Sequence, residues 1–154
     1  IVSTMGKALG VNGGYVVTKK TIARYLRETS PFYIYSNPIT APEADAALKS
    51  LEILNSEQGK SMLAHLSEMT DYFEEGLKDI GHEVIEGPHP VVPLMIRDTK
   101  RTKNIVDYLK ANKVLATAIV YPVVPKGDES IRFQISADHT REDLDYVLDK
   151  IDHF

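Results

Sequence analysis

A lysine in a Gly-rich stretch, Ser3-Thr-Met-Gly-Lys7-Ala-Leu-Gly10, is the first residue whose surroundings suit chemistry. A lysine amine must be neutral to attack a carbonyl, and burial or a neighbouring cation lowers its pKa toward that state. Small neighbours allow a bulky cofactor ring to approach, and the Thr4 hydroxyl, three residues earlier, can bind a phosphate. On this local pattern alone, a plain surface lysine beside a glycine turn remains the favoured interpretation.

Two other phosphate-binding patterns fail at the same lysine. A P-loop needs glycine six residues before the lysine and Ser or Thr after it, but Ile1 and Ala8 occupy those positions. The glycines also have the wrong spacing for a dinucleotide fingerprint. Schiff-base formation is therefore the remaining chemical hypothesis for Lys7.

The segment Ile131-Arg-Phe-Gln-Ile-Ser136 predicts a strand with one apolar and one polar face. Arg132 is on the polar face with Gln134 and Ser136. A guanidinium suits a carboxylate, which it holds through two parallel hydrogen bonds. The alternative is an arginine on a solvated sheet face, which is commoner for an isolated strand.

The loop Tyr121-Pro-Val-Val-Pro-Lys-Gly127 is stiffened by two prolines and is either a binding loop or a rigid connection. The five histidines share no spacing with acidic residues that indicates a metal site, so we predict no metal and no catalytic histidine.

Turn and periodicity signals predict the elements that position these residues. In the first third we expect a short strand at Val16-Val17, a helix at about 19–28 capped by Thr18, and an extended loop over 30–39. A helix capped by Thr40 and Glu43 then runs to Leu54, and Gln58-Gly59 interrupt it. Beyond it we expect helices at about 60–80, 100–112 and 141–152 and strands at about 82–86, 91–97, 113–119 and 130–136.

This order predicts α/β architecture, with a mixed or antiparallel sheet carrying helices on one face. The first residues do not share that alternation. We therefore expect residues 1–57 to be the trailing segment of a larger domain and 58–154 to form a small α/β domain. The start of the chain, dense in small residues and without methionine, indicates a piece of a longer protein.

Composition limits the function classes. The 154 residues carry a net charge of −4, which gives no basic footprint for nucleic acid. No cysteine is present, which removes disulfides and thiolate chemistry and fits a cytoplasmic protein. No apolar run is long enough to predict a membrane span.

Several motifs in this order resemble the carboxy-terminal part of the α-oxoamine synthases, over essentially all 154 residues. The resemblance is strongest to their glycine C-acetyltransferase branch. The motifs are Thr4-Met-Gly-Lys7-Ala-Leu-Gly10, Gly13-Gly-Tyr15, Tyr35-Ser-Asn-Pro38, Pro122-Val-Val-Pro-Lys-Gly127, Ile131-Arg132 and Thr140-Arg-Glu142.

The resemblance implies the small domain and part of the large domain of a fold-type I transferase that uses pyridoxal 5′-phosphate (PLP). Lys7 would hold PLP as a Schiff base and move the α-proton of the amino acid, and Thr4 would bind the phosphate. Ser36 and Asn37 would reach the phosphate in the neighbouring subunit of a homodimer. Arg132 would bind the substrate carboxylate. The substrates would be an amino acid and an acyl-CoA, with glycine and acetyl-CoA forming 2-amino-3-ketobutyrate.

The chain departs from the family pattern at Ser3 and Val11, where glycine is frequent. The family's pyridine-binding Asp, its ring-stacking His and most of its phosphate loop precede the lysine, so we expect these 154 residues alone to be inactive. Alternatives are 8-amino-7-oxononanoate, aminolevulinate or sphingoid-base synthesis, an aminotransferase of the same fold, and a non-catalytic binding or dimerisation module.

Overall fold

The computed structural model describes all residues, 1–154, and divides them into two compact units. The first is Ile1–Lys60 and the second is Ser61–Phe154. The division falls inside the long helix α4 (Glu57–Asp79). Each unit is described by itself.

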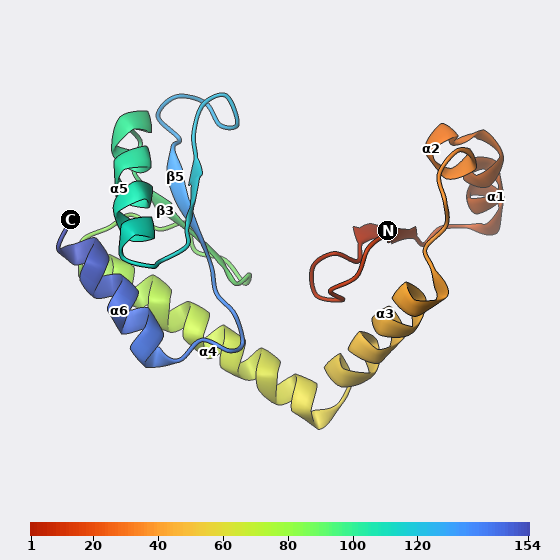
Figure 1. Ribbon diagram of the computed structural model, residues 1–154, viewed down its shortest axis with the longest axis horizontal. Coiled ribbons are helices and arrows are strands. Elements are labelled where there is room, and N and C mark those ends of the chain that lie inside the picture. Colours follow the sequence, from red (N-terminus) through yellow and green to blue (C-terminus); the bar gives the residue numbers. More distant parts are fainter. The chain divides into compact units, whose positions relative to one another are not determined.

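The first unit begins with a two-stranded antiparallel ribbon, β1 (Val2–Thr4) and β2 (Gly14–Val16), in which Thr4 lies opposite Gly14. The loop between these strands carries Lys7 and projects from the ribbon (Figure 1). Three helices follow, α1 (Lys20–Thr29), α2 (Pro31–Ile34) and α3 (Ala41–Leu54). Strand β2 matches the expected strand approximately, whereas β1 had no signal in the sequence.

Two expectations for this unit are wrong. Thr18 does not cap α1, because the chain enters the helix one residue later, at Lys19, which makes no side-chain cap bond. Residues 30–39 are not wholly extended, since Pro31–Ile34 form α2. Proline supplies a preset φ at a first helical position, and the Ser30 carbonyl accepts the N–H groups of Tyr33 and Ile34.

The capping box at Thr40 and Glu43 is confirmed, with both reciprocal bonds present. The break after α3 comes at Asn55-Ser56, earlier than expected. Ser56 accepts the N–H of Gly59 at 3.2 Å, so Gly59 lies in the first turn of α4. A Cβ on Gly59 would lie 2.2 Å from the Ile53 carbonyl oxygen, which explains why this position is glycine.

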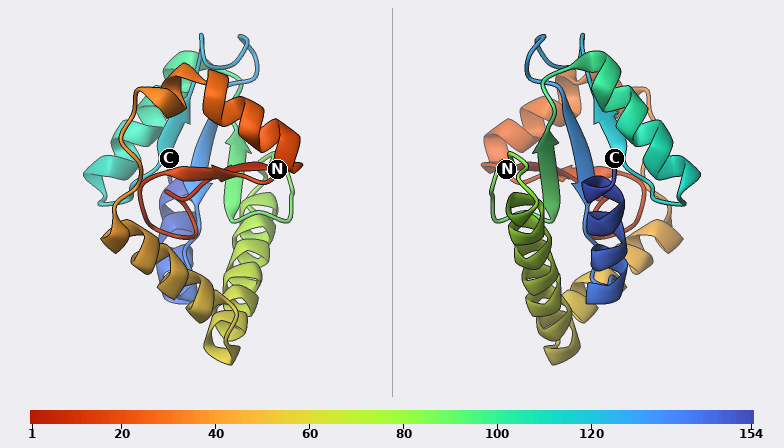
Figure 2. Two further views of the ribbon diagram at one scale, coloured as in Figure 1. Left: turned by 90° about the vertical axis from the view of Figure 1, so that its right-hand side faces the viewer. Right: turned by 90° about the vertical axis from the view of Figure 1, so that its left-hand side faces the viewer.

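The second unit contains a three-stranded sheet in the order β3-β5-β4, formed by β3 (Val91–Met95), β4 (Thr117–Ile119) and β5 (Ser130–Gln134). Both pairings are antiparallel, so the sheet has no parallel component. The expected helices are confirmed as the second part of α4, α5 (Thr99–Ala111) and α6 (Arg141–Asp152). Helices α4 and α6 lie side by side (Figure 2).

Two of the expected strands are reduced. The strand at 82–86 is only a single bridge, between Val84 and Leu94. The strand at 113–119 is confined to Thr117–Ile119, because Lys113 adopts a left-handed φ of 63° that ends α5. The Val114 N–H then bonds back to the Leu109 carbonyl at 2.9 Å, which holds this stretch at the helix end.

One core joins the helices to one face of this sheet. The Phe73 and Phe133 rings meet edge to face with centroids 5.2 Å apart. The core residues are Met69, Phe73, Leu77, Val92, Leu94, Ile105, Leu109, Val114, Ile131, Phe133, Ile135, Leu144 and Ile151. Alternation along β5 therefore buries Ile131 and Phe133 and leaves Arg132 exposed on the opposite face, as the sequence predicts.

The first unit buries far less apolar surface. Met5 and Ala47 are its only buried apolar residues, whereas Phe32 and Tyr35 are 90% and 88% exposed. A stretch of about 60 residues with so little burial gains little hydrophobic stabilisation. None of the helices is both long and apolar enough to pass through a membrane.

Candidate functional site

The loop that carries Lys7 is fixed by backbone hydrogen bonds. Met5 N–H donates to the Gly13 carbonyl at 3.0 Å, which extends the β1–β2 pairing past Thr4. Val11 N–H donates to the Met5 carbonyl at 3.1 Å, and Gly10 N–H to the Lys7 carbonyl at 3.0 Å. Lys7 thus opens a tight turn inside a closed loop, so its backbone has a defined position.

Glycine is required where this loop returns to the ribbon. Gly13 has a φ of 103°, and a Cβ there would lie 2.5 Å from Ile39 Cγ2. A Cβ on Gly14 would lie 2.8 Å from the Ser3 carbonyl oxygen. The Gly-rich composition therefore reflects close backbone approach as well as turn geometry.

Lys7 and Thr4 are paired. Lys7 Nζ donates a hydrogen bond to Thr4 Oγ1 at 3.1 Å, which joins the loop to the last residue of β1. A hydroxyl has one donor and two acceptor sites, so Thr4 can still donate its O–H to a phosphate oxygen. The pair thus offers an amine for a carbonyl and a donor for a phosphate, which fits the reacting ends of PLP.

Lys7 is exposed in these 154 residues. Thr4 also lines a hollow of about 540 Å³ between the β1–β2 ribbon and the helices α1 and α2. Arg27 of α1 lines the same hollow and is a candidate anion-binding residue that sequence reasoning missed. Its place in an amphipathic helix gave no signal that would have separated it from a solvated arginine.

Ser36 and Asn37 follow α2, in the same unit as Lys7 and Thr4. Ser36 Oγ donates to the Phe32 carbonyl, four residues back, and so closes the end of α2. Its proton is therefore engaged within the chain. To donate to a phosphate, Ser36 must give up this bond. Asn37 is exposed.

Arg132 lies in the second unit, in the middle of β5. Its register partners are Pro93 on β3 and Thr117 on β4, so it projects from the centre of the exposed sheet face. Arg24, Arg97 and Arg141 each have a carboxylate within 4.0 Å, whereas no carboxylate lies that close to Arg132. Its guanidinium is free to bind an anion from outside the chain.

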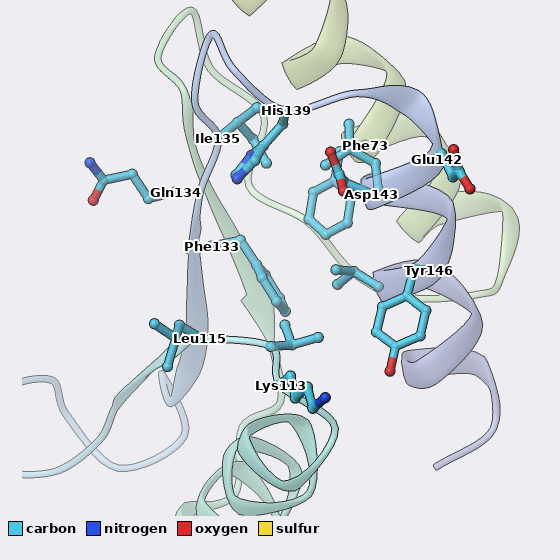
Figure 3. A pocket seen from close by; sticks show the side chains of 13 residues that line it. Phe73, Lys113, Leu115, Phe133, Gln134, Ile135, His139, Glu142, Asp143 and Tyr146 are labelled. Carbon is cyan, nitrogen blue, oxygen red and sulfur yellow. The ribbon is translucent and has the colours of Figure 1, made fainter.

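A cavity of about 700 Å³ in the second unit lies on the helix side of the sheet (Figure 3). Phe133, Gln134 and Ile135 of the β5 segment are among its lining residues, and the Gln134 side chain extends to the opposite side of the strand from Phe133, as Figure 3 shows. Part of its polar rim is engaged within the chain, since Tyr146 donates to the Asn112 carbonyl and His139 Nδ1 accepts the Ser136 N–H. None of the predicted site residues lines this cavity.

Comparison with known proteins decides the family. The family model described as aminotransferase class I and II matches residues 1–151. The chain belongs to this family. The match includes both units, the Lys7 loop and the strand that carries Arg132.

The relatives are α-oxoamine synthases. The chain is 35% identical over 151 residues to 8-amino-7-oxononanoate synthase of Petrotoga mobilis, which covers 98% of this chain and 38% of that protein. It is 33% identical over 148 residues to mitochondrial 2-amino-3-ketobutyrate coenzyme A ligase of Mus musculus. That match covers 96% of this chain and 35% of the mouse protein. The chain thus spans less than two-fifths of the length of these relatives.

Solved structures share the fold. A structure of SPT with its PLP internal aldimine has a TM-score of 0.89 at 22% identity, covering 99% of this chain and 38% of that one. The structure of 8-amino-7-oxononanoate synthase from Francisella tularensis has a TM-score of 0.82 at 25% identity. The match covers 99% of this chain and 44% of that chain. The expected fold of a fold-type I PLP-dependent transferase is confirmed.

The finer expectation of a glycine C-acetyltransferase is not confirmed. Identities of 35% and 33% to two different synthases do not separate their substrates. The α-oxoamine synthase group is therefore supported at the level of relatives, and the acyl chain is left to experiment.

Proposed function

We propose that this chain supplies the PLP-binding lysine and the carboxy-terminal domain of an acyltransferase that joins an amino acid to an acyl-CoA. The observation that carries the proposal is the Lys7–Thr4 pair, at 3.1 Å, in a loop fixed by its own backbone bonds. The family match over residues 1–151 supports the same assignment.

PLP, when bound, supplies an aldehyde for Schiff-base chemistry and an electron-poor ring that stabilises negative charge at the amino acid's α-carbon. Lys7 would hold the cofactor through Nζ, and its amine would serve as the base that takes the α-proton of the amino acid. Thr4 would donate its O–H to a phosphate oxygen, because its bond with the free Lys7 amine uses only an acceptor site of the hydroxyl.

Arg132 binds the carboxylate of the amino acid in this proposal. Its exposed position at the centre of β5 and its lack of an internal carboxylate partner leave both edges of the guanidinium available. Two parallel hydrogen bonds would orient the substrate as well as bind it. The active form in this proposal is a homodimer, in which Ser36 and Asn37 approach the cofactor of the neighbouring subunit.

Within the acyltransferases, we favour glycine and acetyl-CoA as substrates because of the Pro122–Gly127 loop. The alternative is 8-amino-7-oxononanoate synthesis, which has equal support among the relatives. A product of that name needs a seven-carbon acyl donor and alanine. The two are separated by comparing kcat/KM for each pair of substrates in the full-length protein that carries this chain.

Labelling tests the proposal at Lys7. The full-length protein is loaded with PLP, reduced with borohydride and digested, and the labelled peptide is identified by mass. We expect the label on Lys7 in the wild type and none in Lys7→Ala. Lys20→Ala, which removes an exposed lysine of the same unit, should be labelled normally. A label on another lysine overturns the proposal.

A second assay separates the acyltransferase from other functions. An α-oxoamine synthase consumes acyl-CoA and releases CoA, whereas an aminotransferase of the same fold needs a keto acid and no CoA. CoA release that depends on the amino acid supports the proposal. Amino transfer without CoA supports the aminotransferase. If Lys7 is labelled but the protein catalyses neither reaction, the result supports a non-catalytic binding module.

A further inference from the structure

A dense polar network surrounds the end of the Pro122–Gly127 loop in the second unit. Arg97 grips Glu83 with two nitrogens, Nε at 3.0 Å from Oε2 and Nη2 on Oε1. Its third nitrogen, Nη1, donates to the Gly127 carbonyl at 3.1 Å. The Arg97 guanidinium therefore joins Glu83, the residue before the isolated bridge at Val84, to Gly127, the last residue of the loop.

Glu129 holds the same loop from the other side. Its carboxylate is buried, with the residue 2% exposed, and accepts the Gly127 N–H at 2.8 Å and the Thr99 hydroxyl at 2.7 Å. The bond from Thr99 is the main reason that the pKa of the Glu129 carboxyl lies below its ordinary value. The backbone N–H and the carbonyl of Gly127 are thus both bound by side chains.

The backbone of Glu129 is fixed as well. Its carbonyl accepts the N–H groups of Ile96 and Arg97, each at 2.9 Å. The bond from Ile96 continues the β3–β5 register one pair beyond Met95 and Ser130. The second bond exists because Arg97 takes a left-handed φ of 61°, which turns its N–H toward the same oxygen.

Stability alone does not explain an arginine at this position. Left-handed backbone is costly for any residue with a Cβ, so glycine would be the less strained choice. The Arg97 and Glu83 side chains are 50% and 56% exposed, and an ion pair so exposed contributes little to global stability. A strained backbone that holds a side chain in one place points to a need for that side chain.

We propose that Arg97 and Glu129 are positioning residues that lock Gly127–Ser130, and so set the loop and the register of β5 that carries Arg132. This rests on the proposed function, in which Arg132 binds the substrate carboxylate. Arg132 lies three residues after Glu129, a separation of roughly 10 Å along a strand. Because strand side chains alternate, slippage by one residue at Glu129 would turn Arg132 into the core.

The test compares Arg97→Gly with Arg141→Gly in the full-length protein. Arg97→Gly relieves the backbone strain and removes only the clamp. Arg141 forms a similar exposed ion pair, with Glu68 at 2.7 Å, and is the matched control. The first readout is the KM for the amino acid. The second, which needs neither cofactor nor substrate, is the rate of tryptic cleavage between Lys126 and Gly127.

For Arg97→Gly we expect the KM to rise about tenfold with a smaller change in kcat, since misplaced binding groups cost such factors. Cleavage after Lys126 should accelerate about tenfold, because opening of the held segment controls proteolysis. Arg141→Gly should change neither readout more than about twofold. Arg97→Lys keeps the positive charge but not the planar guanidinium that bonds Glu83 and Gly127 together. Its effects on KM and cleavage should lie between those of Arg97→Gly and Arg141→Gly.

Glu129→Gln gives a second variant that keeps the size of the side chain, and it should also accelerate cleavage. Unchanged cleavage or unchanged KM in Arg97→Gly overturns the positioning role, as does an equal effect of Arg141→Gly. These failures differ from failure of the proposed function, which would appear as absence of PLP from Lys7 in the wild-type protein.

Discussion

The amine of Lys7 donates to the hydroxyl of Thr4 at 3.1 Å, three residues earlier, at the end of β1. The two residues are close because Met5 and Gly13 close the base of the loop by a backbone bond. Thr4 therefore lies where it can bind both the lysine and a phosphate, and this double role can be tested by substitution.

Replacing Thr4 by valine should weaken PLP binding and leave the label on Lys7. A hydrogen bond to a charged group contributes about 1.5–3 kcal/mol, so the Kd should rise roughly 10- to 100-fold. Thr4→Ser keeps the hydroxyl and should retain most of the affinity. The measurement is a titration of PLP by absorbance. Thr21→Val, in exposed α1, is the control, and equal affinity of Thr4→Val and wild type would refute the role of Thr4.

Replacing Arg132 by methionine should raise the KM for the amino acid and leave PLP binding unchanged. Loss of a bidentate charge-assisted pair costs about 1.5–3 kcal/mol, which corresponds to roughly 10- to 100-fold. Arg132→Lys should recover part of this loss. Arg101→Lys removes no such contact and serves as the control in steady-state kinetics. A KM for Arg132→Met within twofold of wild type would exclude carboxylate binding by this residue.

Replacing Ser36 by alanine separates a phosphate contact from a helix-end contact. Ser36 donates to the carbonyl four residues back, and Thr29 makes the same kind of bond to Tyr25 at 2.7 Å. If Ser36 reaches a phosphate in the neighbouring subunit, Ser36→Ala should weaken PLP binding about tenfold and Thr29→Val should not. PLP titration with sedimentation analysis checks this. Equal effects of both variants would leave Ser36 as a helix-end residue only.

The buried carboxyl of Glu74 should make the free energy of unfolding depend on pH. It is 6% exposed, one carboxylate oxygen lacks a partner, and burial raises its pKa above the ordinary value of 4.5. The folded state therefore binds this proton more tightly than the unfolded state. The ionised carboxylate destabilises the fold above its raised pKa, and this penalty disappears as the pH falls through that pKa toward 4.5.

Glu74→Gln should therefore raise the urea midpoint at neutral pH and lose this advantage as the pH falls below the ordinary pKa of 4.5, where the carboxyl is protonated in both the folded and the unfolded state. The comparison requires urea unfolding followed by circular dichroism at several pH values. Glu75→Gln, at the exposed neighbouring position, should have little effect. A lower midpoint for Glu74→Gln at pH 7 would show that the charge itself is stabilising.

Helix ends and helix faces were predictable wherever the signal is local. The capping box at Thr40 depends on residues three positions apart and is present as expected, and the structure has the same kind of local cap at Asp98 and Thr140. The two faces of β5 follow from simple alternation. Strand ends were less predictable, because the strand expected at 113–119 is shortened by a left-handed residue, Lys113, which no local pattern indicates.

The sequence by itself determined the family motifs, the position of Lys7 as the candidate PLP-binding amine and the face on which Arg132 lies, since each depends on residue type or short spacing. Only the tertiary structure decided the contacts between distant residues. It showed that Gly13 must accommodate Ile39 and that Gly127 is gripped by Arg97 and Glu129. Such contacts arise when packing brings together segments that sequence spacing does not relate, so no periodicity records them.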